Sequence, residues 1–116
     1  MNADALRGHL DALILAVIEG DPLHGYAIME ALRQRSRGAI DIPTGTLYPA
    51  LRRLERAGYL RSKWSSVDGR RRRTYRLTAA GRRTLASERI AWRDLAVAVE
   101  SVLRASAGKS RRSKLS

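Results

Sequence analysis

The stretch that decides the fold is Pro43-Thr44-Gly45-Thr46-Leu47-Tyr48-Pro49-Ala50-Leu51-Arg52-Arg53-Leu54-Glu55-Arg56-Ala57-Gly58-Tyr59-Leu60. Read at helical period, its apolar residues form one stripe, which consists of Leu47, Ala50, Leu51, Leu54 and Ala57. The opposite side is small and uncharged at its start and basic further along. We predict a helix over residues 44–58 that buries the stripe in a small domain and offers the other side to a nucleic-acid duplex.

The ends of this predicted helix carry recognisable signals. Thr44 or Thr46 is a natural N-cap, and with Thr46 as the cap Pro49 would lie in the first turn, where its missing N–H does no harm. Gly58 is placed to end the helix, after which Tyr59 and Leu60 leave as a strand. Free backbone N–H groups at the helix start would suit a phosphate. The alternative is an ordinary amphipathic helix with a solvated polar face, and the charge distribution decides between the two.

The net charge of +12 is concentrated in two short segments. Residues 1–60 hold seven basic and seven acidic residues, whereas residues 61–76 hold seven basic residues against Asp68 alone, a net charge of +6. Residues 77–103 carry a net charge of +1 and residues 104–116 one of +5. Such clustering indicates a polyanionic partner rather than a general solubility bias.

Composition argues against several function classes. The 116 residues suffice for one core, and cysteine is absent, so that neither a disulfide framework nor a cysteine-ligated metal is expected. The acids are scattered singly, and His9 and His24 are the only histidines, so we expect no catalytic residues, no metal and no cofactor; His24 more naturally caps or hydrogen-bonds a turn. No run of eighteen apolar residues occurs and no basic segment precedes an apolar one at the start, which favours a cytoplasmic protein without membrane contact.

Two further helices are predicted before the central stretch. An apolar stripe including Leu6, Leu10 and Leu13 predicts a helix over about residues 5–19, broken by Gly20-Asp21-Pro22. A second helix is predicted over about residues 25–35, with a turn at 36–39 and a short extended segment at 40–42.

A β-hairpin follows the central helix. Leu60, Ser62 and Trp64 alternate outbound, Arg73, Tyr75 and Leu77 alternate on return, and Asp68-Gly69 marks the turn. Four consecutive arginines, residues 70–73, repel one another, and their placement is understandable if they meet phosphates or enter a minor groove.

A long helix ends the predicted core of the chain. Thr78 is its expected cap, and Leu85, Trp92, Leu95, Val99 and Val102 follow at spacings of 7, 3, 4 and 3, which are typical of a coiled-coil seam. A second stripe of Ile90, Val97 and Leu103 beside it gives more apolar surface than one small domain uses, so we predict a dimerisation helix. The basic, small-residue-rich residues 106–116 are predicted to be disordered.

The fold class is therefore predicted as mainly α with a small β-hairpin: a winged helix-turn-helix domain at 1–77, a dimerisation helix at 78–105 and a basic tail at 106–116. At this point the chain resembles the PadR-like transcriptional regulators. The matching blocks are Pro22-Leu23-His24-Gly25-Tyr26-Ala27-Ile28, then Gly45-Thr46-Leu47-Tyr48-Pro49-Ala50-Leu51-Arg52-Arg53-Leu54-Glu55 with Gly58, and Arg73-Thr74-Tyr75-Arg76-Leu77-Thr78 with Gly81. The single long helix after the hairpin is similar to the subfamily with a short C-terminal region.

The resemblance implies a homodimer that binds a palindromic operator in double-stranded DNA as a repressor and is released by a small effector. In members that bind planar aromatic molecules, a tryptophan on the last helix stacks on the ligand, and Trp92 occupies a comparable place. The arginine-rich hairpin tip is denser than the usual wing of the family.

The predicted contacts follow. Thr46, Pro49 and Arg53 would lie nearest base edges, Tyr48 and Arg52 on phosphates, and Arg70, Arg71 and Arg72 along the flanking backbone or minor groove. The full predicted DNA-binding set is Tyr26, Thr44, Gly45, Thr46, Tyr48, Pro49, Arg52, Arg53, Arg70, Arg71, Arg72 and Arg73. The predicted dimer contacts are Leu6, Leu10, Leu13, Leu85, Trp92, Leu95, Val99 and Val102. A rival hypothesis is a sequence-nonspecific nucleic-acid-binding or architectural protein, against which the uncharged start of the central helix speaks.

Overall fold

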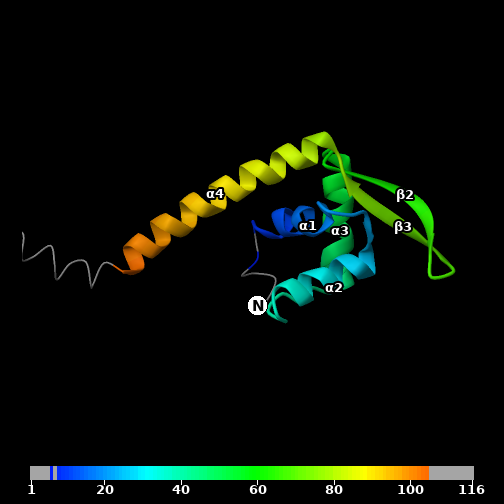
Figure 1. Ribbon diagram of the computed structural model, residues 1–116, viewed down its shortest axis with the longest axis horizontal. Coiled ribbons are helices and arrows are strands. Elements are labelled where there is room, and N and C mark those ends of the chain that lie inside the picture. Colours follow the sequence, from blue (N-terminus) through cyan, green and yellow to red (C-terminus); the bar gives the residue numbers. More distant parts are fainter. Residues whose placement is uncertain (1–5, 7, 105–116) are drawn as a thin grey trace, which may run out of the picture. The chain divides into compact units, whose positions relative to one another are not determined.

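The computed structural model describes residue 6 and residues 8–104, and it confirms a mainly helical fold with a small antiparallel sheet. The elements follow in the order α1 (Leu10–Ile18), β1 (Leu23–His24), α2 (Gly25–Arg35), α3 (Thr44–Arg56), β2 (Leu60–Val67), β3 (Arg70–Leu77) and α4 (Ala79–Leu103) (Figure 1). The chain divides into two compact units, Met1–Leu85 and Ala86–Ser116. The first unit therefore extends into the first turns of α4, beyond residue 77. The tail predicted at 106–116 lies outside the described residues.

One hydrophobic core holds the first unit together. The apolar stripe of α3 is buried as expected, except for Ala57, which is exposed past the helix end. Around it pack side chains from the other two helices, the sheet and the start of α4. The buried apolar residues are Leu6, Ile14, Leu15, Val17, Ile18, Ile28, Leu32, Ile42, Leu47, Ala50, Leu51, Leu54, Leu60, Tyr75, Leu77 and Leu85.

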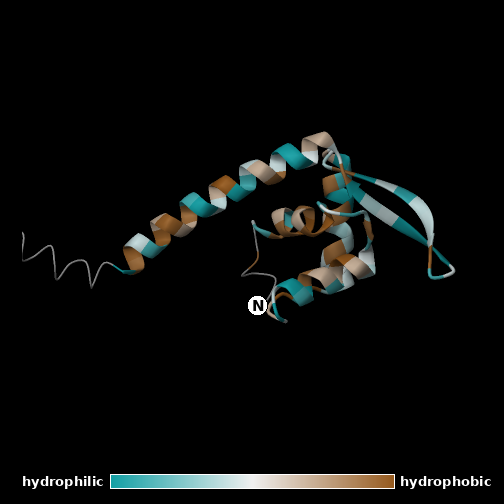
Figure 2. Ribbon diagram, in the orientation of Figure 1, coloured by the Kyte–Doolittle hydropathy of each residue, from teal (hydrophilic) through white to brown (hydrophobic). Residues whose placement is uncertain are grey.

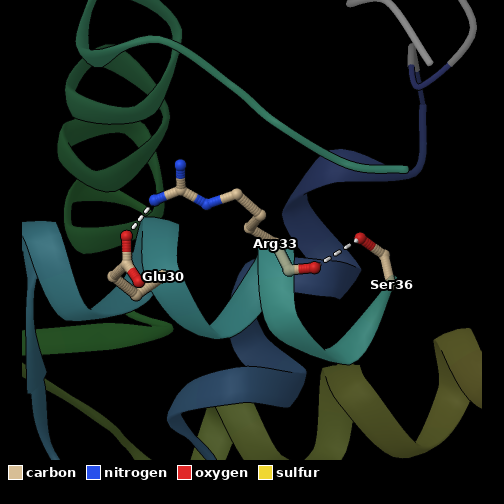
Figure 3. Close-up of polar contacts among 3 residues, drawn as sticks. All are labelled: Glu30, Arg33 and Ser36. Carbon is tan, nitrogen blue, oxygen red and sulfur yellow. Dashed lines mark hydrogen bonds and ion pairs between the residues drawn. The ribbon is translucent and has the colours of Figure 1, made fainter. Parts of the chain in front are cut away.

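The helix-turn-helix connection is shaped by the end of α2. The Ser36 hydroxyl donates to the Arg33 carbonyl at 3.2 Å (Figure 3). It also accepts from the Ile40 amide at 2.8 Å, so one side chain joins the last turn of the helix to the segment that follows. Arg37, at a φ of 54°, takes the left-handed conformation there. The segment at residues 40–42 then runs as an irregular connection in which Ile42 is buried in the core.

The end of α3 sets the direction of the hairpin. Gly58 has a φ of 84°, which a side-chain-bearing residue adopts only at a cost, and it ends the helix as predicted. The Tyr59 amide bonds the Leu54 carbonyl at 3.0 Å and the Gly58 amide bonds the Glu55 carbonyl at 3.0 Å. This pair of bonds is the Schellman pattern, which satisfies the last carbonyls of α3 and starts β2 at Leu60.

The hairpin has the predicted two-residue turn. Val67 pairs with Arg70, and Asp68 and Gly69 between them have φ values of 52° and 74°, as a type I′ turn requires. The sheet has a third strand that the sequence did not reveal, because β1 adds antiparallel to β3 through Leu23–Tyr75 and His24–Thr74 and gives the order β1-β3-β2.

Thr78 caps α4 as predicted. Its hydroxyl accepts from the Gly81 amide at 3.0 Å and donates to the Gly58 carbonyl at 2.6 Å, so that the same side chain joins the starts of α4 and of the hairpin. A Cβ on Gly81 would lie 2.2 Å from the Tyr59 carbonyl oxygen, and this close approach explains a glycine inside a helix.

Candidate nucleic-acid interface

The exposed side of α3 is neutral at its start and cationic in its second half. Thr44, Gly45, Tyr48 and Pro49 lie at the surface and Thr46 is half-buried, whereas Leu47 and Ala50 turn inward. Arg52, Arg53 and Arg56 follow, all exposed. Small neutral groups allow close approach to base edges, and the cations beyond them suit phosphates.

The start of α3 differs from the expectation in two ways. Pro43 is the N-cap residue, and its carbonyl accepts from the amides of Thr46 and Leu47 at 3.0 Å, so Thr46 lies inside the helix and is not its cap. Pro49 consequently lies in the second turn rather than the first. Since proline has no N–H to offer the Gly45 carbonyl, that carbonyl loses its usual donor inside the helix. The amides of Thr44 and Gly45 precede the first intrahelical bonds, and amides at this position of a helix have no acceptor within the helix and can bind a phosphate.

Tyr48 connects α3 to the start of α2. A Cβ added to Gly25 would lie 2.3 Å from the Tyr48 hydroxyl oxygen, so the phenol packs directly against the backbone of that buried glycine. The ring thus spaces the two helices and leaves about a third of its surface, 37%, exposed. A phosphate contact by Tyr48 stays a prediction. It would be made by the exposed part of a side chain whose position is already fixed by packing.

Arg53 makes an ion pair across to α1. Its Nη2 lies 2.5 Å from Asp11 Oδ1, and both side chains are largely exposed. Exposed ion pairs contribute about 0.2–1 kcal/mol, so a DNA phosphate or base edge can replace Asp11 as the partner. On α2, by contrast, Arg33 pairs with Glu30 of its own helix (Figure 3).

The pleat of the hairpin divides the arginine run between two faces. Arg71 and Arg73 lie opposite Ser66 and Trp64, on the face on which Ser62 contacts α3. Arg70 and Arg72 lie opposite Val67 and Ser65, on the other face. The four arginines were expected to act together, but only two of them face the same way as Ser62.

A hydrogen-bonded chain ties that face to α3. The Ser62 hydroxyl donates to Glu55 Oε2 at 2.5 Å and accepts from Arg73 Nε at 2.9 Å. Trp64, exposed for 55% of its surface, lies within 5.5 Å of the Arg73 guanidinium carbon and 5.2 Å of that of Arg71, measured from the ring centroid. Sequence reasoning placed Trp64 on a strand and did not include it in the site. The two-residue turn was the signal, because it fixes Trp64 opposite Arg73.

The other face of the hairpin meets β1 and α2. A groove there is lined by His24, Tyr26, Glu30, Asp68 and Arg72 together with further polar and apolar residues. Desolvation lowers the pKa of His24, the charge of Arg72 lowers it further, and Asp68 opposes both. His24 stands at the N-cap position of α2, in the turn where the sequence predicted a capping or hydrogen-bonding role, but its side chain makes no capping hydrogen bond.

Tyr26, at the start of α2, keeps 55% of its surface exposed and remains available for the predicted DNA contact.

Tyr75, on the sheet face that carries Ser62, is buried, and desolvation followed by the nearby Glu55 charge raises its pKa. Its hydroxyl is therefore neutral, and Tyr75 serves the core.

The predicted dimer residues fall into two groups. Leu6 and Leu85 are only 5% and 2% exposed, so their side chains are covered within the single chain and have no free surface for a partner. Leu10 and Leu13 are half-buried against the same core. In the second unit the large apolar residues of α4 are exposed. They are Ile90, Trp92, Leu95, Val97, Val99, Val102 and Leu103. Figure 2 shows hydrophobic segments alternating with hydrophilic ones along this part of the helix.

Within the residues that the structure describes, no group of three or more histidines, cysteines, aspartates or glutamates could hold a metal ion. Nor is any helix of this part of the chain long and apolar enough to cross a membrane.

Comparison with known proteins agrees with this geometry. The model of the transcriptional regulator PadR-like family matches residues 14–87. Transcriptional regulator Rv3488 of Mycobacterium tuberculosis is 46% identical over 74 residues, which are 64% of this chain and 66% of that protein.

Two solved structures are similar over most of their length. A PadR family transcriptional regulator from Eggerthella lenta is 35% identical with a TM-score of 0.75, covering 86% of each chain. A PadR family transcription regulator from Clostridium difficile is 31% identical with a TM-score of 0.74, covering 83% of this chain and 99% of the other.

Proposed function

The chain belongs to the PadR-like family of transcriptional regulators, and we propose that it binds a palindromic operator as a homodimer and acts as a repressor. The family consists of regulators rather than enzymes. The observation that carries the specific part of the proposal is the exposed, uncharged start of α3, flanked by cations on the same helix and on the hairpin. A binder that relies on charge alone would gain affinity from lysine or arginine at Gly45 and Thr46, which lie at this start.

The proposed docking places the N-terminal half of α3 in the major groove. Thr46 and Pro49 approach base edges, and Arg53 joins them by exchanging Asp11 for DNA. Arg52 and the free amides at the helix start take phosphates, with Tyr48 at the rim. The hairpin then follows the flanking backbone or the minor groove, with Arg71 and Arg73 on the side of α3.

The homodimer is proposed to form through the second half of α4. Seven large apolar side chains are exposed on this helix, and five of them share one side at helical period: Trp92, Leu95, Val99, Val102 and Leu103. A monomeric soluble domain rarely leaves such a stripe open. Leu95, Val99 and Val102 supply the coiled-coil seam. In the first unit, Leu10 and Leu13 are proposed as further dimer contacts with the surface that they leave uncovered. Two protomers would then place their recognition helices about 34 Å apart, one DNA turn.

A small apolar or aromatic effector is proposed to bind beside Trp92, a residue that is 56% exposed. An effector that enters between the two last helices would change the spacing of the recognition helices and so weaken operator binding. This role, like repression itself, is supported by the family resemblance.

The direct test is a fluorescence-anisotropy titration of the purified protein with its own upstream promoter DNA and with a random duplex at matched salt. A specific dimeric regulator should prefer the promoter by about a thousandfold or more, at two protomers per site. The proposal would be contradicted if the promoter bound no more tightly than the random duplex and if genomic fragments enriched by binding to the protein showed no preference either. The protein would then be a sequence-nonspecific binder.

A further inference from the structure

Trp64 occupies a position where a structural role does not account for it. It lies on the hairpin in β2 with 55% of its surface exposed, and it is absent from the buried core. A large aromatic side chain that fills no core is expected to contact something else. Its neighbours on the same sheet face are cations: Arg73 lies directly opposite and Arg71 diagonally opposite.

Both guanidinium groups lie over the indole ring. The Arg71 and Arg73 guanidinium carbons are 5.2 Å and 5.5 Å from the ring centroid, within the range of a cation–π contact. The two cations repel each other, and each long side chain has many rotamers, so without the ring they would spread into solvent. A cation–π contact uses the positive charge of the guanidinium and takes up no hydrogen-bond acceptor, so N–H groups other than the Arg73 Nε–H, which donates to Ser62, can still bind a phosphate. The ring therefore orders both arginines without occupying their donors.

One of the two arginines is also connected to the recognition helix. Arg73 Nε donates to the Ser62 hydroxyl, which donates to Glu55 of α3. These two hydrogen bonds hold Arg73, and with it the contact to Trp64, at a fixed position relative to α3. Arg70 and Arg72, on the other face, have no part in this arrangement, and the Arg72 Nε is a buried atom without a hydrogen-bond partner among the described residues.

We propose that Trp64 is a positioning residue for DNA binding: its ring holds Arg71 and Arg73 on the recognition-helix side of the hairpin, where they bind backbone phosphates. The inference rests on the proposed DNA-binding function. In this proposal Arg71 and Arg73 bind phosphates, and Arg70 and Arg72 lie on the opposite face of the hairpin.

The test uses the full chain and a fluorescein-labelled random duplex, because phosphate contacts do not depend on sequence. Trp64→Leu keeps an apolar side chain but loses the cation–π attraction. It should weaken binding by about fivefold to tenfold, since two mobile arginines must then be ordered on binding. Trp64→Phe keeps a weaker ring and should fall between Leu and the wild type.

A matched pair of double variants tests the division between the faces. R71Q/R73Q and R70Q/R72Q remove the same charge from the same strand. We expect the first pair to weaken binding about tenfold more than the second and to reduce the slope of log affinity against log salt by about two. Equal losses from the two pairs would contradict the assignment.

The decisive measurement adds Trp64→Leu to R71Q/R73Q. If Trp64 acts through the arginines, the added substitution changes the affinity less than twofold. If the same fivefold loss persists, the ring contacts DNA itself and the positioning role is wrong; wild-type affinity of Trp64→Leu alone would also overturn it. Thermal unfolding of each variant confirms that the fold is intact. Failure of the wild type to bind any duplex would instead reject the proposed function.

Discussion

Two helices of this protein carry the same kind of apolar stripe and use it differently. The stripe of α3 is buried in its own chain, where Leu47 and Leu51 are completely covered, whereas the large apolar residues of α4 beyond Leu85 are exposed. Periodicity alone predicts that each stripe is buried somewhere, and it does not say against what. Whether a stripe is buried within the chain depends on the packing partners in its own compact unit. The helix α3 packs against other elements of the first unit, whereas the second half of α4 belongs to a different unit.

The largest expected effect is on the free energy of unfolding, and it should follow truncation of a side chain in the stripe of α3 but not in that of α4. Leu51→Ala leaves a cavity in the core and should lower the free energy of unfolding by about 2–5 kcal/mol. Val99→Ala removes a side chain exposed within the single chain and should leave the unfolding of the first unit unchanged. Chemical denaturation of both variants, at protein concentrations low enough to dissociate a dimer, measures the difference. Similar losses in the two variants would mean that α4 belongs to the same folded core.

The next largest effect concerns association. Leu95→Glu and Val99→Glu place a carboxylate on the exposed stripe, and burying it against a second copy would leave it unpaired. We expect either variant to sediment as a monomer where the wild type is a dimer, with unchanged helical circular dichroism. Asp94→Asn, at an exposed position of the same helix that lies outside the seam, is the control and should leave association unchanged. A wild type that is itself monomeric at all concentrations would contradict the proposed dimer.

Much of the first unit could be predicted because its signals are local. The bounds of α2, the glycine stop of α3, the Asp68-Gly69 turn and the Thr78 cap depend on neighbours within a few residues. The missed features depend on contacts distant in sequence. The two-residue strand β1 exists only through β3, and Arg53 meets Asp11 across 42 positions of sequence.

The candidate site shows the same division. The neutral start of α3 and the cations that follow it were evident from the sequence, and their exposure is confirmed. The division of the arginine run and the pairing of Trp64 with Arg73 follow from the register, which the turn already fixed. The stacking of Arg71 on Trp64 depends on side-chain conformations that no spacing encodes. Leu6 and Leu85 were assigned to the dimer because periodicity does not distinguish a stripe covered by its own chain from one left open.

A smaller effect is expected at the hairpin, where charge rather than burial acts. Arg71→Ala should weaken binding by a similar factor on every DNA sequence and should reduce the salt slope by about one, because a single phosphate contact is lost. Anisotropy titrations of promoter and random duplexes over a series of salt concentrations measure both quantities. A selective loss on one sequence would show that Arg71 reads bases.

The smallest expected effect is on the pH dependence of stability, and it should appear in the first unit and not in association through the second. The pKa of His24 is lowered from its ordinary value of 6.5, chiefly by desolvation and secondly by Arg72. Well above pH 6.5 the imidazole is neutral in both the folded and the unfolded chain, so it adds no pH dependence there. As the pH falls below 6.5 the unfolded chain takes up the proton first, and the free energy of unfolding of the first unit should fall. His24→Gln should flatten this part of the stability curve in denaturation experiments between pH 7.5 and pH 5. Residues 86–104 contain no histidine, so association through α4 should not follow the same titration. If the wild type and His24→Gln lose stability in parallel, the acid sensitivity comes from other groups.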